Sequence, residues 1–237
     1  MIFGAILAGG TGSRMGVDKP KQFLKIGDKK PIIIHTIEKF MLCAKFDHIY
    51  IGIHADWIDY TKDLITKYIG PTNKIILVTG GENRNATIFN IISSIEKKYG
   101  ASDEHIIVTH DAVRPFVTLR IINENIVTAQ KYGACDTVVK AIDTIVESED
   151  AVVINNIPER SHMFQGQTPQ SFNINLIKRL YYDLSNDEKA ILTDACKICV
   201  VRDVQVRLVE GEITNIKITT VDDLKIARAM IEDELYV

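Results

Sequence analysis

The sequence predicts an α/β protein with a mostly parallel sheet and helices on both faces of that sheet. Strand-like and helix-like stretches alternate over the first two thirds of its 237 residues. The expected strands are rich in Ile and Val with little polar alternation, as is typical of strands covered on both faces. No repeat or Pro/Gly/Ser-rich linker interrupts the chain, so we expect a single domain over residues 1–237.

The individual elements follow from the spacing of apolar residues. The expected strands are 2–8, 48–54, 74–79, 105–109 and 137–141. Between the strands, apolar side chains recur at three- and four-residue steps, which predicts amphipathic helices. These helices are expected over 57–68, 88–95 and 119–129.

From residue 142 to about 166 the pattern changes. Two β-rich runs, 142–147 and 151–157, flank the acidic turn Ser148-Glu149-Asp150, and a short third run follows at 162–165. We expect a projecting β-hairpin arm. Because such an arm has few partners inside one subunit, we expect it to pack against a second copy of the chain in a homodimer.

The last part of the chain returns to mixed structure. Helical segments are expected after Asn173, and a β-rich run covers 204–209. A final helix should begin near Thr220, where Thr-Val-Asp-Asp forms a loose capping box.

Composition excludes several classes of partner. The formal net charge is −3, from 28 basic and 31 acidic residues, so no positive field is available to hold a polynucleotide by counterion release. The longest apolar runs, such as 32–34 and 198–201, are strand-sized and far below the roughly 18 residues that cross a bilayer. The first residues lack the features of a secretory signal. We therefore expect a cytoplasmic protein with no nucleic-acid or membrane partner.

The four cysteines include one Cys-x-x-Cys, formed by Cys196 and Cys199. This spacing can serve a redox pair or half of a zinc site. No second pair and no His cluster accompany it, which favours buried cysteines acting as small apolar residues.

A glycine-rich loop after the first strand is the first candidate site. It reads Leu-Ala-Gly-Gly-Thr-Gly-Ser-Arg-Met-Gly, and its Gly9, Gly10 and Gly12 let backbone N–H groups approach phosphate oxygens. Arg14 and Lys21 add positive charge in the same stretch. The dinucleotide-binding and Walker patterns both fail on spacing. The alternative to a phosphate site is a tight connection.

Two further motifs stand at the ends of strands. The pair Gly80-Gly81 leads into a helix, whose N-terminus attracts anions, although alone this motif would be an ordinary turn. Asp111 ends a buried strand and supplies the oxygen ligand that Mg²⁺ takes when phosphates supply others. The alternative for Asp111 is a pair with Arg114 or a cap on the next turn. We expect His110 to be structural.

The last motif places Lys217 inside an apolar and β-branched run, where a lysine must face solvent or an anion. Two glycine turns, one acidic residue and several cations together suit a magnesium-bound triphosphate.

These motifs, in this order, resemble the cytidylyltransferase family that includes the methylerythritol-phosphate and ribitol-5-phosphate enzymes. The matching stretches are Leu-Ala-Gly-Gly-x-Gly-Ser-Arg-Met-Gly, Lys-Pro-Lys-Gln-Phe, Gly-Gly-x-x-Arg-x-x-Thr, His-Asp-Ala-Val-Arg-Pro-Phe, Gln-Thr-Pro-Gln-Ser-Phe, Thr-Asp-Ala and Asn-Ile-Lys-Ile-Thr. The resemblance implies a single Rossmann-like domain with its β-arm exchanged in a homodimer. It also implies conversion of CTP and a polyol phosphate into a CDP-polyol and pyrophosphate.

The resemblance also implies roles for particular residues. Arg14 and Lys21 would hold the triphosphate, Asp111 would bind Mg²⁺, and Lys217 would hold the acceptor phosphate and the α-phosphate. The residues implied around cytosine and ribose are Ala8, Gly81, Glu82, Arg84 and Thr87. The residues implied to reach the polyol phosphate are Arg160 and Thr168 of the arm, across the dimer, assisted by Thr193.

The choice of acceptor depends on two stretches. Methylerythritol enzymes usually read Thr-Asp-Glu where this chain has Thr193-Asp194-Ala195, and Met-Phe-Gln-Gly-Gln-Thr near the arm also resembles the ribitol branch. Our hypothesis is D-ribitol 5-phosphate, with CDP-ribitol feeding a polymer such as wall teichoic acid. The alternatives are a methylerythritol-phosphate enzyme of isoprenoid synthesis and a nucleotide-sensing module without turnover. Retention of Arg14, Lys21, Asp111 and Lys217 argues against the sensing module.

Overall fold

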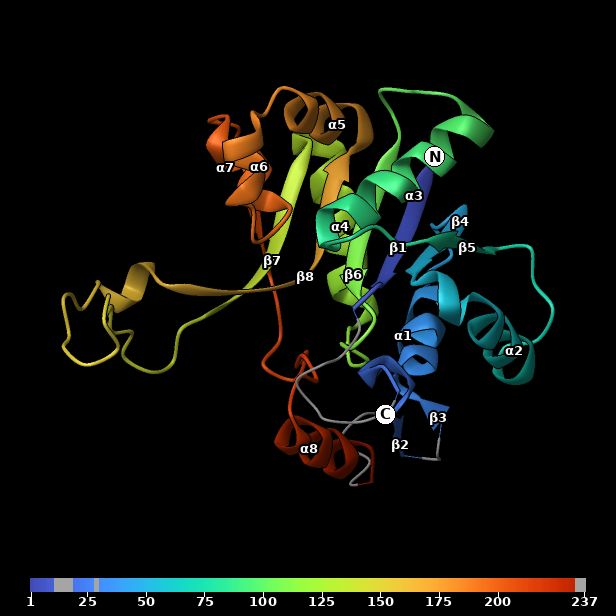
Figure 1. Ribbon diagram of the computed structural model, residues 1–237, viewed down its shortest axis with the longest axis horizontal. Coiled ribbons are helices and arrows are strands. Elements are labelled where there is room, and N and C mark those ends of the chain that lie inside the picture. Colours follow the sequence, from blue (N-terminus) through green and yellow to red (C-terminus); the bar gives the residue numbers. More distant parts are fainter. Residues whose placement is uncertain (11–18, 28–29, 233–237) are drawn as a thin grey trace.

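The computed structural model describes residues 1–10, 19–27 and 30–232, and within these ranges a seven-stranded sheet forms the centre of the protein (Figure 1). The strand order is β5-β4-β1-β6-β8-β7-β9. The bounds are β1 Ile2–Ala8, β4 His48–Ile53, β5 Ile75–Thr79, β6 Ile106–Asp111, β7 Ala134–Lys140, β8 Phe164–Asn173 and β9 Arg207–Glu210. Every neighbouring pair is parallel except those of β8, which runs antiparallel between β6 and β7. The mostly parallel sheet is confirmed.

Helices cover both faces of this sheet (Figure 1). Their bounds are α1 Ile32–Met41, α2 Ile58–Tyr68, α3 Arg84–Tyr99, α4 Leu119–Tyr132, α5 Ile174–Tyr182, α6 Asn186–Ala190, α7 Cys196–Val201 and α8 Val221–Glu232. The short strands β2 Lys25–Ile26 and β3 Lys30–Pro31 pair with each other near α8. The prediction of helices on both faces is confirmed.

Successive side chains of β1 point to opposite faces of the sheet, and each face packs into its own apolar core. Phe3 and Ala5 pack among residues of α3, α5 and α7, whereas Ile6 and Ala8 pack among residues of α1, α2 and α4. Each fully buried Ile or Phe contributes about 1.5–3 kcal/mol by leaving water. In β4, a Cβ on Gly52 would collide with Thr87 Cγ2, so this glycine lets α3 approach the sheet closely.

The apolar run 32–34 has the length of a strand but lies in α1, and 198–201 lies in α7. In α1, Ile33, Ile37 and Phe40 recur at helical spacing and are buried against the sheet. These isoleucines therefore cover a face of the sheet.

The arm differs from the predicted hairpin. Residues 141–163 project from the ends of β7 and β8 (Figure 1), but the expected strands at 142–147 and 151–157 are wrong. The two runs share one isolated bridge, Glu147 with Asn156, before a 3-10 turn at Arg160–His162. Most of the Val and Ile side chains of the arm are exposed, with Val152 at 84%. Residues 164–166, also assigned to the arm, belong to β8.

The C-terminal elements follow the prediction closely. The run at 204–209 becomes strand at Arg207, and α8 begins at Val221. Asp223 N donates to Thr220 Oγ1 at 3.1 Å, and Thr220 N donates to Asp223 Oδ2 at 2.8 Å, so the capping box is confirmed.

Among the helices of the described residues, none combines the length and the apolar composition that crossing a membrane would require.

Candidate functional site

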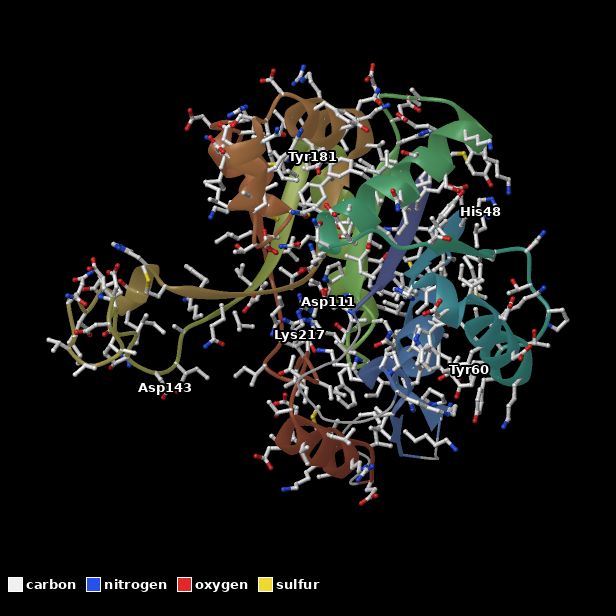
Figure 2. The ribbon with its side chains drawn as sticks, in the orientation of Figure 1. His48, Tyr60, Asp111, Asp143, Tyr181 and Lys217 are labelled. Atoms are coloured by element: carbon white, nitrogen blue, oxygen red, sulfur yellow. The ribbon has the colours of Figure 1, made fainter. Side chains whose placement is uncertain are left out.

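A cavity of about 310 Å³ opens where β1 and β6 end and α3 begins. This is the edge at which open α/β sheets bind ligands, outside the carboxyl ends of their parallel strands. Figure 2 shows Asp111 and Lys217 lying close together at this edge. The predicted site residues that line the cavity are Ala8, Gly9, Gly10, Lys21, Gly81, Glu82, Arg84, Thr87, Asp111 and Lys217. Arg14 and Gly12 lie outside the described residues.

The glycine turns are held in place by side chains behind them. Gln22 is 2% exposed, and its Nε2 donates to Ala8 O at 2.8 Å, which fixes the end of β1. Gly81 N donates to Thr87 Oγ1 at 3.0 Å, while that hydroxyl donates to Asn83 O at 3.0 Å. A Cβ on Gly81 would collide with Ala86. The second turn is therefore fastened to the N-terminus of α3, with backbone close to the cavity.

Three cations surround the carboxylate of Asp111, which ends β6. Lys217 Nζ lies 2.9 Å from Oδ2, Arg84 Nε lies 3.3 Å from Oδ1, and Arg114 Nε lies 3.7 Å from Oδ2. Burial alone would raise the pKa of Asp111, but the three positive charges hold that pKa well below its usual range. Asp111 is therefore ionised at neutral pH. The pairing with Arg114 that the sequence offered as an alternative is present beside the two other contacts.

Arg114 also positions the loop that carries Lys217. The Arg114 side chain is 10% exposed, and its Nη1 donates to Asn215 O at 2.7 Å. Asn215 is fully buried, and its Nδ2 donates to Thr168 O at 2.8 Å. The segment before α8 is thereby joined to the ends of β6 and β8, which brings Lys217 to Asp111.

His110 is structural, as expected, and the directions of its hydrogen bonds can be assigned. Its Nε2 lies 2.9 Å from Arg114 O, which can only accept, so Nε2 carries the proton. Burial lowers the pKa of His110 to about 4, which leaves the ring neutral at pH 7. Nδ1 therefore accepts from Thr168 Oγ1 at 2.9 Å, and Thr168 Oγ1 accepts from Asp111 N at 3.2 Å.

Thr168 does not lie on the projecting arm, so that assignment is corrected. It sits inside β8, is 4% exposed and is hydrogen-bonded beside Asp111 of the same chain. Arg160 does lie on the arm, where it is exposed and its Nη1 donates to Ile142 O at 3.2 Å. Thr193 is exposed just before α7. Neither Arg160 nor Thr193 lines the cavity.

Asp111 is a residue of the cavity whose chemistry fits the predicted Mg²⁺ ligand, because its ionised carboxylate offers oxygen atoms. Within the described ranges, no three His, Cys, Asp or Glu side chains are grouped as a metal site of their own. An ionised carboxylate at the cavity matches a metal that takes its remaining ligands from phosphates and water.

Cys196 and Cys199 are buried and free, and burial raises the pKa of the Cys199 thiol to about 12. Both cysteines therefore behave as apolar residues, as expected.

Sequence reasoning missed a polar cluster formed by side chains of β7, β8 and the segment before α7. Gln170 Nε2 donates to Asp136 Oδ1 at 3.1 Å and also to Asp194 Oδ2. Burial raises the pKa of Asp136 to about 7, and the negative charge of Asp194 adds to this shift. The available signal was an aspartate within a largely apolar and β-branched run, Ala-Cys-Asp-Thr-Val-Val.

Comparison with known proteins identifies relatives over the whole fold. A family model described as IspD, 2-C-methyl-D-erythritol 4-phosphate cytidylyltransferase, matches residues 2–233. The 4-diphosphocytidyl-2C-methyl-D-erythritol synthase of Anaerococcus prevotii DSM 20548 is 27% identical, with 98% of this chain and 96% of that chain covered and a TM-score of 0.81.

Two further solved structures are similar. The 2-C-methyl-D-erythritol 4-phosphate cytidylyltransferase of Francisella tularensis is 26% identical, with 95% of this chain and 97% of that chain covered and a TM-score of 0.78. The enzyme of the same name from Thermus thermophilus is 24% identical, with 98% and 100% covered and a TM-score of 0.74, and it supports the fold alone.

Proposed function

This chain belongs to the 2-C-methyl-D-erythritol 4-phosphate cytidylyltransferase family, and we propose that it transfers the cytidylyl group of CTP to D-ribitol 5-phosphate. The products are CDP-ribitol and pyrophosphate. The observation that carries this proposal is the ionised Asp111 with Lys217 at 2.9 Å, in a cavity lined by two glycine turns and Lys21. A nucleoside triphosphate needs backbone donors, cations and a divalent metal; the site supplies the backbone donors and the cations, and Asp111 would hold the metal.

The reaction is a displacement at phosphorus. An oxygen of the acceptor phosphate forms a bond to the α-phosphorus, and the bond from that phosphorus to the oxygen bridging to the β-phosphate breaks, so the electron pair leaves with pyrophosphate. No covalent enzyme intermediate is needed. Lys21 and Arg14 hold the triphosphate and stabilise the charge of the departing pyrophosphate. Lys217 holds the acceptor phosphate beside the α-phosphate, which raises their effective concentration.

The two glycine turns bind the nucleotide largely through backbone groups. Gly9 and Gly10 would direct N–H groups to the phosphates, and Ala8, Gly81 and Glu82 would surround cytosine and ribose. Thr87 supports the second glycine turn instead of contacting the nucleotide through its hydroxyl, because that hydroxyl is already hydrogen-bonded to Gly81 N and Asn83 O. Arg84 lies between the nucleotide turn and Asp111.

Mg²⁺ held by Asp111 would neutralise charge on the phosphates when the nucleotide is bound. The support for this role is the low pKa of Asp111 and its position on the cavity wall.

The proposed acceptor and the proposed homodimer are linked. Arg160 would reach the polyol phosphate of a neighbouring copy, with Thr168 and Thr193 nearby, and Ala195 replaces the Glu usual in methylerythritol enzymes. The arm of each copy exposes apolar side chains such as Val152 and Ile157, which a partner would cover. Sedimentation is expected to show a dimer at micromolar concentration; a monomer alone would contradict this part.

A second candidate acceptor is 2-C-methyl-D-erythritol 4-phosphate, because that substrate appears in the names of the matching family and structures. Release of pyrophosphate from CTP, in the presence of Mg²⁺ and each acceptor in turn, separates the two. We expect kcat/KM to be higher with D-ribitol 5-phosphate. A clear preference for the methylerythritol acceptor would overturn our choice, and no release with any polyol phosphate would favour a nucleotide-sensing module.

A further inference from the structure

Asp136, Gln170 and Asp194 form a polar cluster in the layer between the sheet and α7. Gln170 is 1% exposed, and both carboxylates accept hydrogen bonds from its Nε2. Asp194 Oδ1 accepts from Cys196 N at 2.7 Å and from Lys197 N at 3.2 Å. Asp194 is therefore occupied on both oxygens, whereas Asp136 Oδ2 points to a different neighbour.

That neighbour is the exposed Gly166 of β8. A Cβ built on Gly166 would lie 3.7 Å from Asp136 Oδ2. A side chain at position 166 would be in van der Waals contact with this carboxylate, and Asp136 itself is partly exposed. Gly166 does not have a positive φ angle, so the backbone conformation does not require glycine at this position. Glycine at position 166 therefore leaves room beside Asp136 Oδ2 that a larger side chain would fill.

The cluster lies beside Asp111 along the sheet. Thr168 and Gln170 stand two positions apart in β8; Thr168 contacts Asp111 of β6, and Gln170 contacts Asp136 of β7. Strands β6 and β7 flank β8, so their spacing is about 10 Å. This is the order of length of an extended five-carbon polyol phosphate. Arg84 is near both ends, because its Nε lies 3.3 Å from Asp111 Oδ1 and its positive charge acts to lower the pKa of Asp136.

Two buried polar atoms at the cluster lack hydrogen-bond partners within the described part of the chain. They are Gln170 Oε1, an acceptor, and Arg84 Nη1, a donor. A buried polar group without a hydrogen-bond partner lowers the stability of the folded state by about 1–3 kcal/mol. A ligand that forms hydrogen bonds with these two atoms would remove that cost. A hydroxyl group both donates and accepts, and it can therefore satisfy a carboxylate or amide oxygen and a guanidinium together.

We propose that the cluster of Asp136, Gln170 and Asp194 binds hydroxyl groups of the acceptor's polyol chain, and that Asp136 determines which polyol is accepted. This inference rests on the proposed function. The acceptor phosphate lies at Lys217 and Asp111, and the polyol chain extends across β8 toward Asp136. The raised pKa of Asp136 supports this role, because a carboxyl group that is partly protonated near pH 7 can donate to or accept from a hydroxyl.

The test measures KM and kcat with D-ribitol 5-phosphate and with its 1-deoxy and 2-deoxy analogues. In the wild-type protein, removing the hydroxyl that contacts the cluster should raise KM about tenfold, the effect of one hydrogen bond to a charged group. Asp136→Ala should raise KM for D-ribitol 5-phosphate by a similar factor. In this variant, KM for the analogue that lacks the contacting hydroxyl should equal KM for D-ribitol 5-phosphate. KM for CTP should stay within twofold. Equal losses with all three acceptors would show a purely structural role and overturn the proposal.

Gly166→Ala is the second variant, because it keeps the carboxyl group but covers it. It should raise KM for D-ribitol 5-phosphate and leave KM for CTP unchanged; an unchanged acceptor KM would count against the proposed access. Asp63→Asn, an exposed carboxylate on α2, is the matched control and should behave as wild type.

Failure of the proposed function gives a different result. If the wild-type protein uses only 2-C-methyl-D-erythritol 4-phosphate, the proposed acceptor is wrong, and the same variants are then measured with that acceptor. A raised KM in Asp136→Ala would still support the cluster as a polyol site, and an unchanged KM would overturn it.

Discussion

The ammonium of Lys217 and the carboxylate of Asp111 lie 2.9 Å apart, although one precedes α8 and the other ends β6. Arg114 joins the two segments through its bond to Asn215 O. The pair is therefore held by a buried polar scaffold, while Lys217 itself is 42% exposed on the cavity side. Such an arrangement keeps charges in position before a ligand arrives, which is the main requirement for electrostatic stabilisation of phosphoryl chemistry.

Lys21 is expected to act on the transition state. Lys21→Ala should lower kcat by about a hundredfold, the scale seen when one preorganised charge-stabilising group is removed. The rate of pyrophosphate release under saturating substrates measures this. Lys19→Ala is the control, since Lys19 is an exposed neighbour that does not line the cavity. Near-normal turnover by Lys21→Ala would refute the role.

Asp111 should also matter for stability. Asp111→Asn leaves Arg84, Arg114 and Lys217 around a neutral group, and repulsion among the cations is no longer offset. We expect the free energy of unfolding to fall by about 2 kcal/mol, less than for a fully buried pair because two of the cations are partly exposed. Urea unfolding at pH 7 measures the change. An equally stable variant would mean that the ion pairs are weak in solution.

The parallel half of the sheet and the cavity were predictable because they depend on local patterns. Ile2–Ala8 is a continuous apolar run followed by glycines, and ligand sites of α/β sheets lie at such strand ends. Only the start of β8 fell within an expected run, that at 162–165, because Phe-Gln-Gly-Gln-Thr-Pro-Gln-Ser-Phe-Asn lacks an Ile or Val run and contains Pro and Gly. Its place in the sheet comes from neighbours distant in the sequence.

The same limit applies to the side chains of the site. Asp111 and Lys217 were each recognised from their surroundings, but the scaffold of Arg114 and Asn215 that joins them depends on tertiary packing. The cluster of Asp136, Gln170 and Asp194 spans β7, β8 and the segment before α7, so no short motif contains it. The arm was predicted as strands because its residues are β-branched, yet within one chain they have no neighbouring strand that would pair with them over the described residues.

His110 offers a direct test of the assigned hydrogen bonds. We expect NMR of the imidazole nitrogens to show a neutral ring with the proton on Nε2 from about pH 5.5 to 8, since burial lowers its pKa to about 4. The partners are Arg114 O and the Thr168 hydroxyl. A proton on Nδ1, or titration near pH 6.5, would contradict this assignment.

Asp136 should make stability depend on pH. Its folded-state pKa is raised to about 7, so the folded protein binds a proton that the unfolded chain releases near pH 4. Wild-type stability should therefore fall relative to Asp136→Asn as pH rises from 4 to about 7, by about 1 kcal/mol or more. Thermal or urea unfolding of both proteins across this range measures the difference. A difference that stays constant with pH would contradict the raised pKa.

The most direct measurement is a crystal structure with CTP and Mg²⁺ bound. We predict the triphosphate against the backbone of Gly9 and Gly10 with Lys21 on its phosphates, and the metal ion on the carboxylate of Asp111. A nucleotide bound elsewhere, or a cavity filled by the protein's own side chains at saturating CTP, would contradict the account.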